Sequence, residues 1–128
     1  MDAILVVSGS RGITDQELVS KILDKALEEA NLSQERVSRL VHGGSHGVDE
    51  LASSWAQSKG ISVQVIRPHW RVGAHAGLLR NTTLVQMATH VVAIWDTKST
   101  GTLDTITKAR KSSLEEGKWI RIYTVEKD

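Results

Sequence analysis

Strand-type and helix-type segments alternate along this chain, and the alternation constrains the fold more than any single motif. Short apolar runs predict five strands, at residues 3–7, 37–42, 61–66, 91–95 and 119–125. Apolar residues repeating every three or four positions predict helices between them, at residues 15–30, 47–58, 75–87 and 102–116. Strict strand–helix alternation predicts a parallel sheet covered by helices on both faces. We therefore expect a single three-layer α/β domain over residues 1–128.

The composition of the strands predicts their order in the sheet. The first and fourth strands, residues 3–7 and 91–95, are apolar throughout, as is typical of central strands. The third strand alternates apolar and polar residues and the fifth contains Arg121, so both are predicted to lie at edges. The order 3-2-1-4-5 satisfies these patterns, whereas a flavodoxin-like order would place the third strand in the middle. The prediction is a Rossmann-like five-stranded sheet whose winding reverses between strands one and four, where open α/β sheets bind ligands.

Local signals predict where two of the helices begin and end. Thr14, with Glu17 three residues later, fits a capping box at the start of the first helix. Gly60 is placed to end the second helix. We expect the last residues, 126–128, to be frayed.

Composition narrows the class of protein. The chain is 40% hydrophobic and 24% charged with a net charge of +1, values typical of globular proteins. Its basic residues are scattered, which disfavours nucleic acid as a partner. The absence of cysteine excludes disulfides, zinc thiolate sites and a cysteine nucleophile. No apolar run approaches the roughly 20 residues of a membrane span, and no signal peptide is recognisable, so we expect a cytoplasmic protein without membrane contacts.

Three loops rich in glycine and hydroxyl side chains follow strands one, two and four. They are Ser8-Gly9-Ser10-Arg11-Gly12, the segment from His42 to Asp49, and Ser99-Thr100-Gly101-Thr102. Because these strands are neighbours in the predicted order, the loops should line one crevice at the carboxyl ends of the strands. A tight turn or a helix cap would explain any one loop, but their convergence favours a ligand site.

The residue types in these loops suit a phosphate or a nucleotide. Glycines let the backbone approach an anion closely, and free N–H groups at helix starts attract negative charge. Arg11 can offer paired donors to a phosphate, and Asp49 can either cap its own helix or accept from a ribose hydroxyl or a base edge. The residues expected to bind the ligand are Ser8, Gly9, Ser10, Arg11, Gly43, Gly44, Ser45, Gly47, Asp49, Arg80, Asn81, Ser99, Gly101 and Thr102.

Other motifs in the sequence indicate a function less strongly than the three loops do. The stretch GGSHG lacks the ending of a Walker A loop and the spacing of a complete GxGxxG, which disfavours a P-loop NTPase. His42 and His46 could meet a ligand, but their spacing offers too few metal ligands, so we expect neither a metal nor a cofactor. Trp70 could form a lid or a stacking wall. Packing in the core or at an interface is favoured for all four tryptophans because the chain has no phenylalanine.

These motifs resemble those of the SLOG superfamily, whose members bind nucleotides and nucleotide derivatives. The stretches VVSGSRGIT and VHGGSHGVDELASSWA are similar to the Rossmann core of the DprA/Smf proteins. The stretch RNTTLVQMATHVVAIWDTKSTGTLDT is similar to the second half of the Lonely-guy (LOG) phosphoribohydrolases. The small stand-alone YspA-related SLOG group shares all four motifs in order. Here these are Gly9-Ser10-Arg11, Gly43 to Asp49, Trp70…Gly73…Ala76-Gly77…Arg80-Asn81, and Gly101-Thr102.

The resemblance to the LOG enzymes is incomplete at the residues that carry their reaction. Those enzymes cleave the N-glycosidic bond between base and ribose phosphate, using a helical arginine and a glutamate three residues beyond the Gly-Thr threonine. Arg80 matches the arginine, but Thr105 occupies the glutamate position, with Asp104 one residue short. Lys98-Ser99-Thr100 also replaces the Pro-Gly-Gly of the LOG loop. The resemblance therefore supports a nucleotide-binding pocket more strongly than it supports cleavage of an N-glycosidic bond.

We expect a module that binds a nucleotide or a nucleotide-derived small molecule as a sensor, carrier or sequestering agent. The alternative is a LOG-like nucleoside 5′-monophosphate phosphoribohydrolase in which Arg80 positions the phosphate and Asp104 is the catalytic carboxylate. Binding of single-stranded DNA in the DprA manner is disfavoured by the near-neutral charge. Because LOG and DprA relatives associate, the resemblance also implies a homo-oligomer.

Overall fold

The five strands form one parallel sheet in the order β3-β2-β1-β4-β5, in a computed structural model that describes residues 2–126. The strands are β1 (Ala3–Gly9), β2 (Val37–His42), β3 (Val63–Val65), β4 (His90–Trp95) and β5 (Trp119–Thr124). The predicted order is confirmed, with β1 and β4 adjacent and central. Of the end that was expected to be frayed, residues 127–128 lie outside the described part of the chain.

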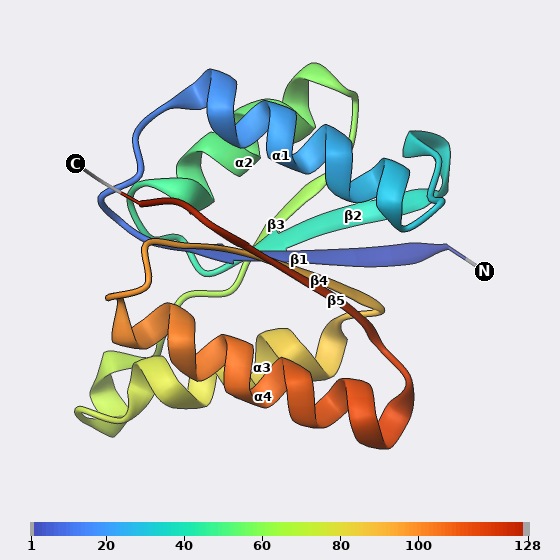
Figure 1. Ribbon diagram of the computed structural model, residues 1–128. Helices are drawn as coiled ribbons and strands as arrows, with labels where there is room; N and C mark the ends of the chain where they lie inside the picture. The colour runs from blue at the N-terminus through green and yellow to red at the C-terminus, as the bar shows by residue number, and fades with distance from the viewer. Residues whose placement is uncertain (1, 127–128) are drawn as a thin grey trace.

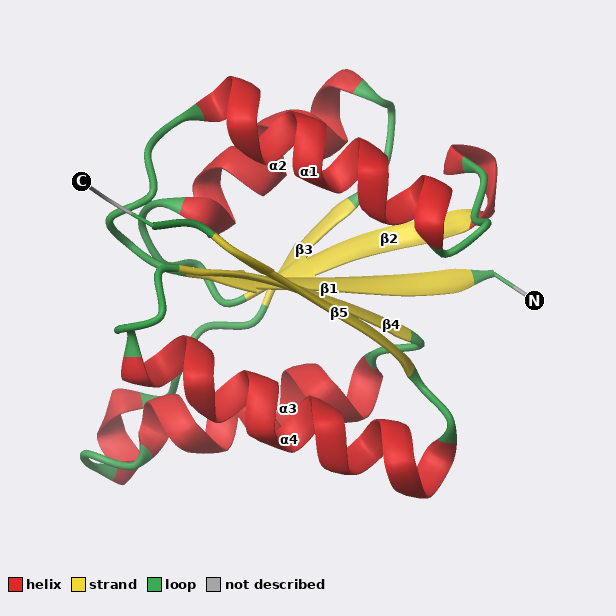
Figure 2. Ribbon diagram, in the orientation of Figure 1, coloured by secondary structure: helices red, strands yellow, loops and turns green. Residues whose placement is uncertain are grey.

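Two helices cover each face of the sheet (Figures 1 and 2). Helices α1 (Gln16–Glu29) and α2 (Val48–Ser58) lie on one face, and α3 (Ala76–Met87) and α4 (Thr100–Glu116) lie on the other. Single 3₁₀ turns, η1 (Gln34–Arg36) and η2 (Trp70–Val72), precede β2 and α3. The predicted three-layer α/β architecture is therefore confirmed. Within residues 2–126, no helix combines the length and the apolar character that crossing a bilayer requires.

The burial of β1 on both faces explains its uninterrupted apolar sequence from Ala3 to Val7. Leu5 and Val7 pack into the core beneath α1 and α2, whereas Val6 joins the cluster beneath α3 and α4. Successive side chains of a strand point to opposite faces, so a strand between two helical layers needs apolar residues at every position. Leu5, Val6 and Val7 are almost completely buried. This double burial fixes β1 at the centre of the molecule.

Several helix and strand boundaries differ from the predicted ones. Asp15, rather than Thr14, caps α1, because its carboxylate accepts a hydrogen bond from the N–H of Leu18. Helix α4 begins at Thr100, two residues earlier than its apolar pattern predicted. The edge strand β3 is only three residues long. Of these differences, the earlier start of α4 matters most for the site, because it moves the first turn of the helix into the third loop.

Candidate functional site

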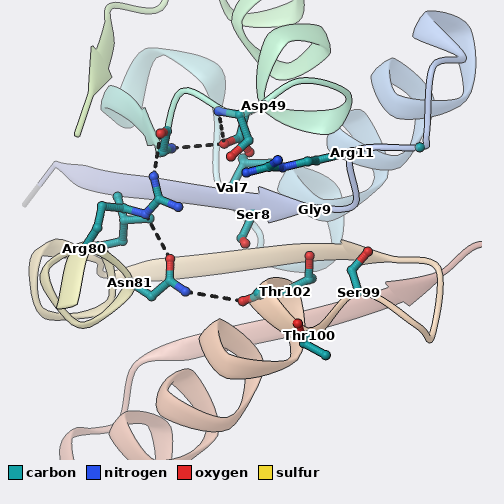
Figure 3. A pocket seen from close by; sticks show the side chains of 15 residues that line it. Val7, Ser8, Gly9, Arg11, Asp49, Arg80, Asn81, Ser99, Thr100 and Thr102 are labelled. Carbon is teal, nitrogen blue, oxygen red and sulfur yellow. Dashed lines mark hydrogen bonds between the residues drawn. The ribbon is translucent and has the colours of Figure 1, made fainter. Parts of the chain in front are cut away.

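The carboxyl ends of β1, β2 and β4 open onto a cavity of about 430 Å³, here called the first lobe (Figure 3). The predicted residues that line it are Ser8, Gly9, Arg11, Gly43, Ser45, Asp49, Arg80, Asn81, Ser99, Gly101 and Thr102. The expected convergence of the three loops is therefore present, and α3 adds Arg80 and Asn81. Ser10 and Gly47 do not line the lobe, whereas Gly44 lies in an adjoining cavity.

Ser10 connects the loops to one another. It is completely buried, and its N–H donates to the carbonyl oxygen of Ile94 at 3.1 Å. Its hydroxyl oxygen accepts from the N–H of Asp96 at 3.0 Å, and its carbonyl accepts from the N–H of Val48 at the start of α2. Ser10 therefore holds the first loop against the other two and does not face the cavity.

Gly9 and Gly47 permit close contacts within the protein. A methyl group added at Gly9 would lie 2.4 Å from Cβ of Val48, which shows how closely α2 packs on the end of β1. A methyl group added at Gly47 would lie 2.5 Å from the carbonyl oxygen of Arg11, and Gly47 has a φ of +78°. Both glycines are required by neighbouring protein atoms, which the sequence pattern alone did not distinguish from a requirement for ligand space.

The first turn of α4 faces the first lobe without a side-chain cap. The usual capping position is Ser99, but its hydroxyl instead donates to Oδ2 of Asp96 at 3.1 Å. The N–H groups of Ser99 and Lys98 donate to Oδ1 of Asp96, and these bonds lower the pKa of Asp96 to about 2. The turn at residues 100–102 thus presents N–H groups at the positive end of the helix dipole, an arrangement that attracts anions.

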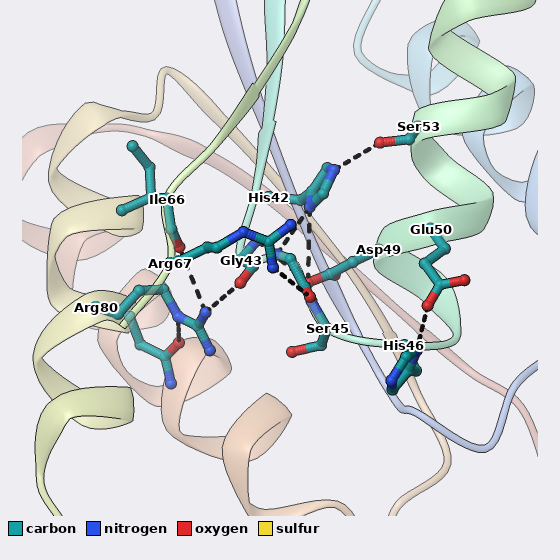
Figure 4. Close-up of polar contacts among 12 residues, drawn as sticks. His42, Gly43, Ser45, His46, Asp49, Glu50, Ser53, Ile66, Arg67 and Arg80 are labelled. Atoms are coloured by element: carbon teal, nitrogen blue, oxygen red, sulfur yellow. Dashed lines mark hydrogen bonds and ion pairs between the residues drawn. The ribbon is translucent and has the colours of Figure 1, made fainter. Parts of the chain in front are cut away.

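Arg80 joins α3 to the second loop (Figures 3 and 4). Its Nη1 donates to the carbonyl oxygens of Gly43 and Ile66, and its Nε donates to Oδ1 of Asn81 at 3.0 Å. Asn81 in turn donates to the carbonyl oxygen of Gly101 at 3.3 Å. This chain of hydrogen bonds fixes the guanidinium at the wall of the lobe and fastens α3 to the start of α4. Asn81 therefore acts through its neighbours, with both ends of its amide engaged.

Asp49 is a buried carboxylate with one oxygen occupied and one unpartnered. Its Oδ2 accepts from the N–H groups of Gly43 and Ser45, each at 3.1 Å, and so shapes the second loop. Its Oδ1 is buried without a hydrogen-bond partner among the described residues. Burial raises the pKa of Asp49 to about 6, although the Ser45 N–H and the charges of Arg80 and Arg11 oppose the shift. Asp49 lines the first lobe and can accept a hydrogen bond from a ligand hydroxyl.

His42 supports the second loop from behind (Figure 4). Its Nδ1 accepts from the N–H of Gly44 at 2.9 Å, and its Nε2 lies 2.6 Å from the Ser53 hydroxyl. An acceptor role at Nδ1 assigns the proton to Nε2, so the ring is neutral. Burial, reinforced by Arg67 and Arg80, lowers the pKa of His42 to about 4. His42 is therefore occupied by the protein, whereas His46 lies exposed at the rim and pairs with Glu50.

The pKa shifts of Asp49 and His42 are opposite in sign and predict opposite dependences of folding stability on pH. The substitution Asp49→Asn makes the effect of the Asp49 shift measurable. The folded-state pKa of Asp49 lies above its usual 3.8, so its contribution to stability is lost as pH rises through about 6. The folded-state pKa of His42 lies below its usual 6.5, so its contribution is lost as pH falls toward about 4. We expect Asp49→Asn to gain stability relative to wild type between pH 4 and 6, by at most about 1.4 kcal/mol per pH unit.

Urea denaturation across this pH range measures the effect. The variant His42→Gln is the matched comparison and should show the opposite trend, losing relative stability as pH rises from 4 to 6.5. Parallel pH profiles for wild type and Asp49→Asn would contradict the assignment of a raised pKa to this carboxylate.

Asp104, the predicted catalytic carboxylate, lies outside the lining of the first lobe. Its Oδ2 pairs with the ammonium group of Lys108 at 2.8 Å and accepts from the amide of Asn81 at 3.0 Å. Lys108 also donates to the carbonyl oxygen of Leu78, so the pair connects α4 to α3. In this arrangement Asp104 helps to link α3 and α4 beneath the site.

A second cavity of about 490 Å³, here called the second lobe, adjoins the first. It is lined in part by Arg67, Pro68, Trp70 and Leu78, from the segment between β3 and α3 and from α3 itself. Arg67 was not predicted, and Trp70 was predicted chiefly as a packing residue. The predicted topology did contain a signal for these two residues, because the loop after β3 leaves the same edge of the sheet as the three predicted loops.

A parallel sheet with a cationic, glycine-lined crevice at its winding reversal defines an α/β protein of the Rossmann-like class. The sequence model of the YspA, cpYpsA-related SLOG family (YAcAr) matches residues 3–73, more than half of the chain. The protein therefore belongs to this SLOG family, as its motifs suggested.

A solved structure supports the same fold. The chain is similar to DNA processing protein A (DprA) from Streptococcus pneumoniae, with a TM-score of 0.69 and 17% sequence identity. The similarity covers 94% of this chain and 50% of the DprA chain, so the protein spans about half the length of that relative. At this identity the likeness shows the fold alone. No match was found among curated proteins.

Proposed function

We propose that the first lobe binds the phosphate of a nucleotide or a nucleotide-derived small molecule, and that the protein acts as a sensor, carrier or sequestering module. The observation that carries this proposal is the uncapped first turn of α4, which faces the same cavity as Arg11 and Arg80. Helix N-termini and guanidinium groups are both well suited to hold phosphate in proteins. Membership of a SLOG family supports a nucleotide-related role.

The side chains around the lobe favour a phosphate ester over a simple anion. Arg11 extends into the lobe toward Asp49, and its guanidinium makes no hydrogen bond to another residue within the described chain (Figure 3). Its donors are therefore available for an anion. The unpartnered Oδ1 of Asp49 would repel a phosphate but suits a hydroxyl donor. Cationic and anionic groups in one cavity match a ligand that carries both a phosphate and hydroxyls, as a ribose phosphate does.

A ligand panel tests the proposal. We expect nucleoside phosphates and ribose 5-phosphate to raise the melting temperature of the purified protein, whereas uncharged nucleosides should do so much less. Native mass spectrometry would show the corresponding mass and any molecule carried through purification. A panel in which no phosphate-bearing member stabilises the protein would overturn the proposal.

Cleavage of an N-glycosidic bond is the alternative, and the position of Asp104 gives it less support. Its carboxylate is engaged by Lys108 and Asn81 and does not line the cavity in which Arg80 lies. General acid catalysis requires the acid within hydrogen-bond reach of the group that receives the proton.

We therefore expect wild type and Asp104→Asn to release the same amount of free base from nucleoside 5′-monophosphates, as measured by chromatography. The two proteins should also bind nucleotide with affinities within about twofold of each other. Base release by wild type that disappears in Asp104→Asn, with nucleotide binding retained, would instead establish the hydrolase.

A further inference from the structure

The two lobes share Arg11 and Arg80 but differ in their remaining walls. Arg11, Gly43 and Arg80 line both cavities, so the lobes meet at the two arginines. Beyond this junction the first lobe is lined largely by hydroxyl and backbone groups. The second lobe is instead walled by Pro68, Trp70 and other apolar residues. A ligand spanning both lobes would therefore need a polar end and an apolar end.

Trp70 differs from the other tryptophans in its exposure. Trp55 is 2% exposed and its indole N–H donates to Asp24, whereas Trp70 is 65% exposed. Large exposed apolar side chains that border a cavity commonly mark binding sites. Trp70 lies in η2, and Leu78, 46% exposed, lines the same cavity from α3. The second lobe thus offers an aromatic side chain that is largely uncovered by the described residues.

Arg67 adds hydrogen-bond donors to this apolar wall. Its Nη1 donates to the carbonyl oxygen of Gly44 at 3.3 Å, which holds the side chain across the second loop (Figure 4). Gly44 has a φ of +75°, and a methyl group there would lie 2.7 Å from Nη1 of Arg67. The glycine therefore permits the close approach of the guanidinium. The remaining N–H groups of Arg67 are donors that can serve acceptors on the edge of a ligand.

We propose that the second lobe is a nucleobase subsite in which the base stacks on the indole of Trp70 while the phosphate lies in the first lobe, between α4 and the two arginines. This proposal rests on the proposed function and extends it to the recognition of the base. A nucleobase fits the chemistry of the lobe because it is planar and apolar on its faces and carries acceptors at its edge. A sugar or an aliphatic group would use only part of this surface.

The test compares ligands with and without a base. Ribose 5-phosphate and the tightest-binding of the common nucleoside 5′-monophosphates serve as probes, with Kd measured by calorimetry. We expect Trp70→Ala to weaken binding of the nucleotide by roughly 5- to 150-fold and to leave ribose 5-phosphate unchanged within twofold. Trp70→Phe, which keeps an aromatic face, should retain most of the nucleotide affinity. Nucleotide should also quench a component of the tryptophan fluorescence that is absent in Trp70→Phe.

The outcomes separate this proposal from the proposed function. Equal Kd values of wild type and Trp70→Ala for the nucleotide would overturn the subsite while leaving phosphate binding intact. An equal loss for both probes would also overturn it, because Trp70 would then support the whole crevice. A change in oligomeric state on size-exclusion chromatography, with nucleotide affinity unchanged, would assign Trp70 to a protein interface. Failure of wild type to bind either probe would instead contradict the proposed function itself.

Discussion

Arg11→Ala should weaken binding of a nucleoside phosphate by roughly 10- to 100-fold while leaving the folded protein as stable as wild type. Arg11 lines both lobes and is exposed, so its truncation removes a ligand contact without opening the core. Hydrogen bonds to charged groups contribute roughly 1.5–3 kcal/mol, which corresponds to this loss of affinity. Surface substitutions away from special backbone positions usually change stability by no more than about 0.5 kcal/mol.

Calorimetry with the tightest-binding nucleotide, together with urea denaturation, measures both parts of the expectation. Arg110→Ala is the matched control, because Arg110 is an exposed arginine of α4 that does not line either lobe. Arg11→Lys should fall between wild type and alanine, since lysine keeps the charge but loses the paired donors. A large loss of stability with unchanged affinity would make Arg11 a structural anchor and exclude it from the ligand site.

Gly47→Ala should destabilise the fold by about 3 kcal/mol. The added methyl group would lie 2.5 Å from the carbonyl oxygen of Arg11 and 2.6 Å from that of Ser10. Backbone atoms cannot rotate away as a side chain does, so the first loop or the start of α2 must shift. Gly47 also has φ +78° and ψ −125°, a conformation that alanine adopts only with strain. Because the displaced carbonyl belongs to Arg11, ligand binding should fall as well.

Gly60→Ala separates the steric clash of the added methyl group from the strain of the backbone conformation. Gly60 has a similar φ of +72°, but a methyl group there meets no other part of the described chain within 4 Å. Its substitution should therefore cost only about 1 kcal/mol, the contribution of the backbone conformation alone. Chemical denaturation of both variants gives the comparison directly. Equal losses for Gly47→Ala and Gly60→Ala would show that the loop relaxes around the added methyl group.

The fold was predictable because burial imposes a pattern on each strand. Val6 and Leu5 face different helical layers, so β1 is apolar from Ala3 to Val7, and this pattern predicted its central place. The meeting of the three loops then followed from parallel pairing, which brings all carboxyl ends to one edge. The start of α4 was placed too late, because helix periodicity cannot detect a first turn that is polar and faces a cavity.

The site was less predictable, because a glycine in a loop does not reveal what occupies the space of its missing side chain. At Gly47 that space is taken by a backbone carbonyl, whereas at Gly101 it is free of contacts from elsewhere in residues 2–126. Ser10 matched the motif equally well, yet it is buried among backbone groups. Trp70 is not in the core, and its packing at an interface stays a prediction, because exposure beside a cavity is visible only in three dimensions. The nucleotide ligand and the homo-oligomer stay predictions.

The division of the site between the two helical layers determines when, during synthesis, the chain becomes able to bind a ligand at the proposed site. Arg11 and Asp49 come from the early part of the chain, whereas Arg80 and the first turn of α4 come from the later part. The hydrogen bond from Arg80 to the carbonyl of Gly43 joins these parts directly. A nascent chain that has not yet exposed residue 102 therefore lacks the helix terminus of the proposed phosphate site. Affinity for the ligand should arise late in synthesis and abruptly, once α4 docks on the sheet.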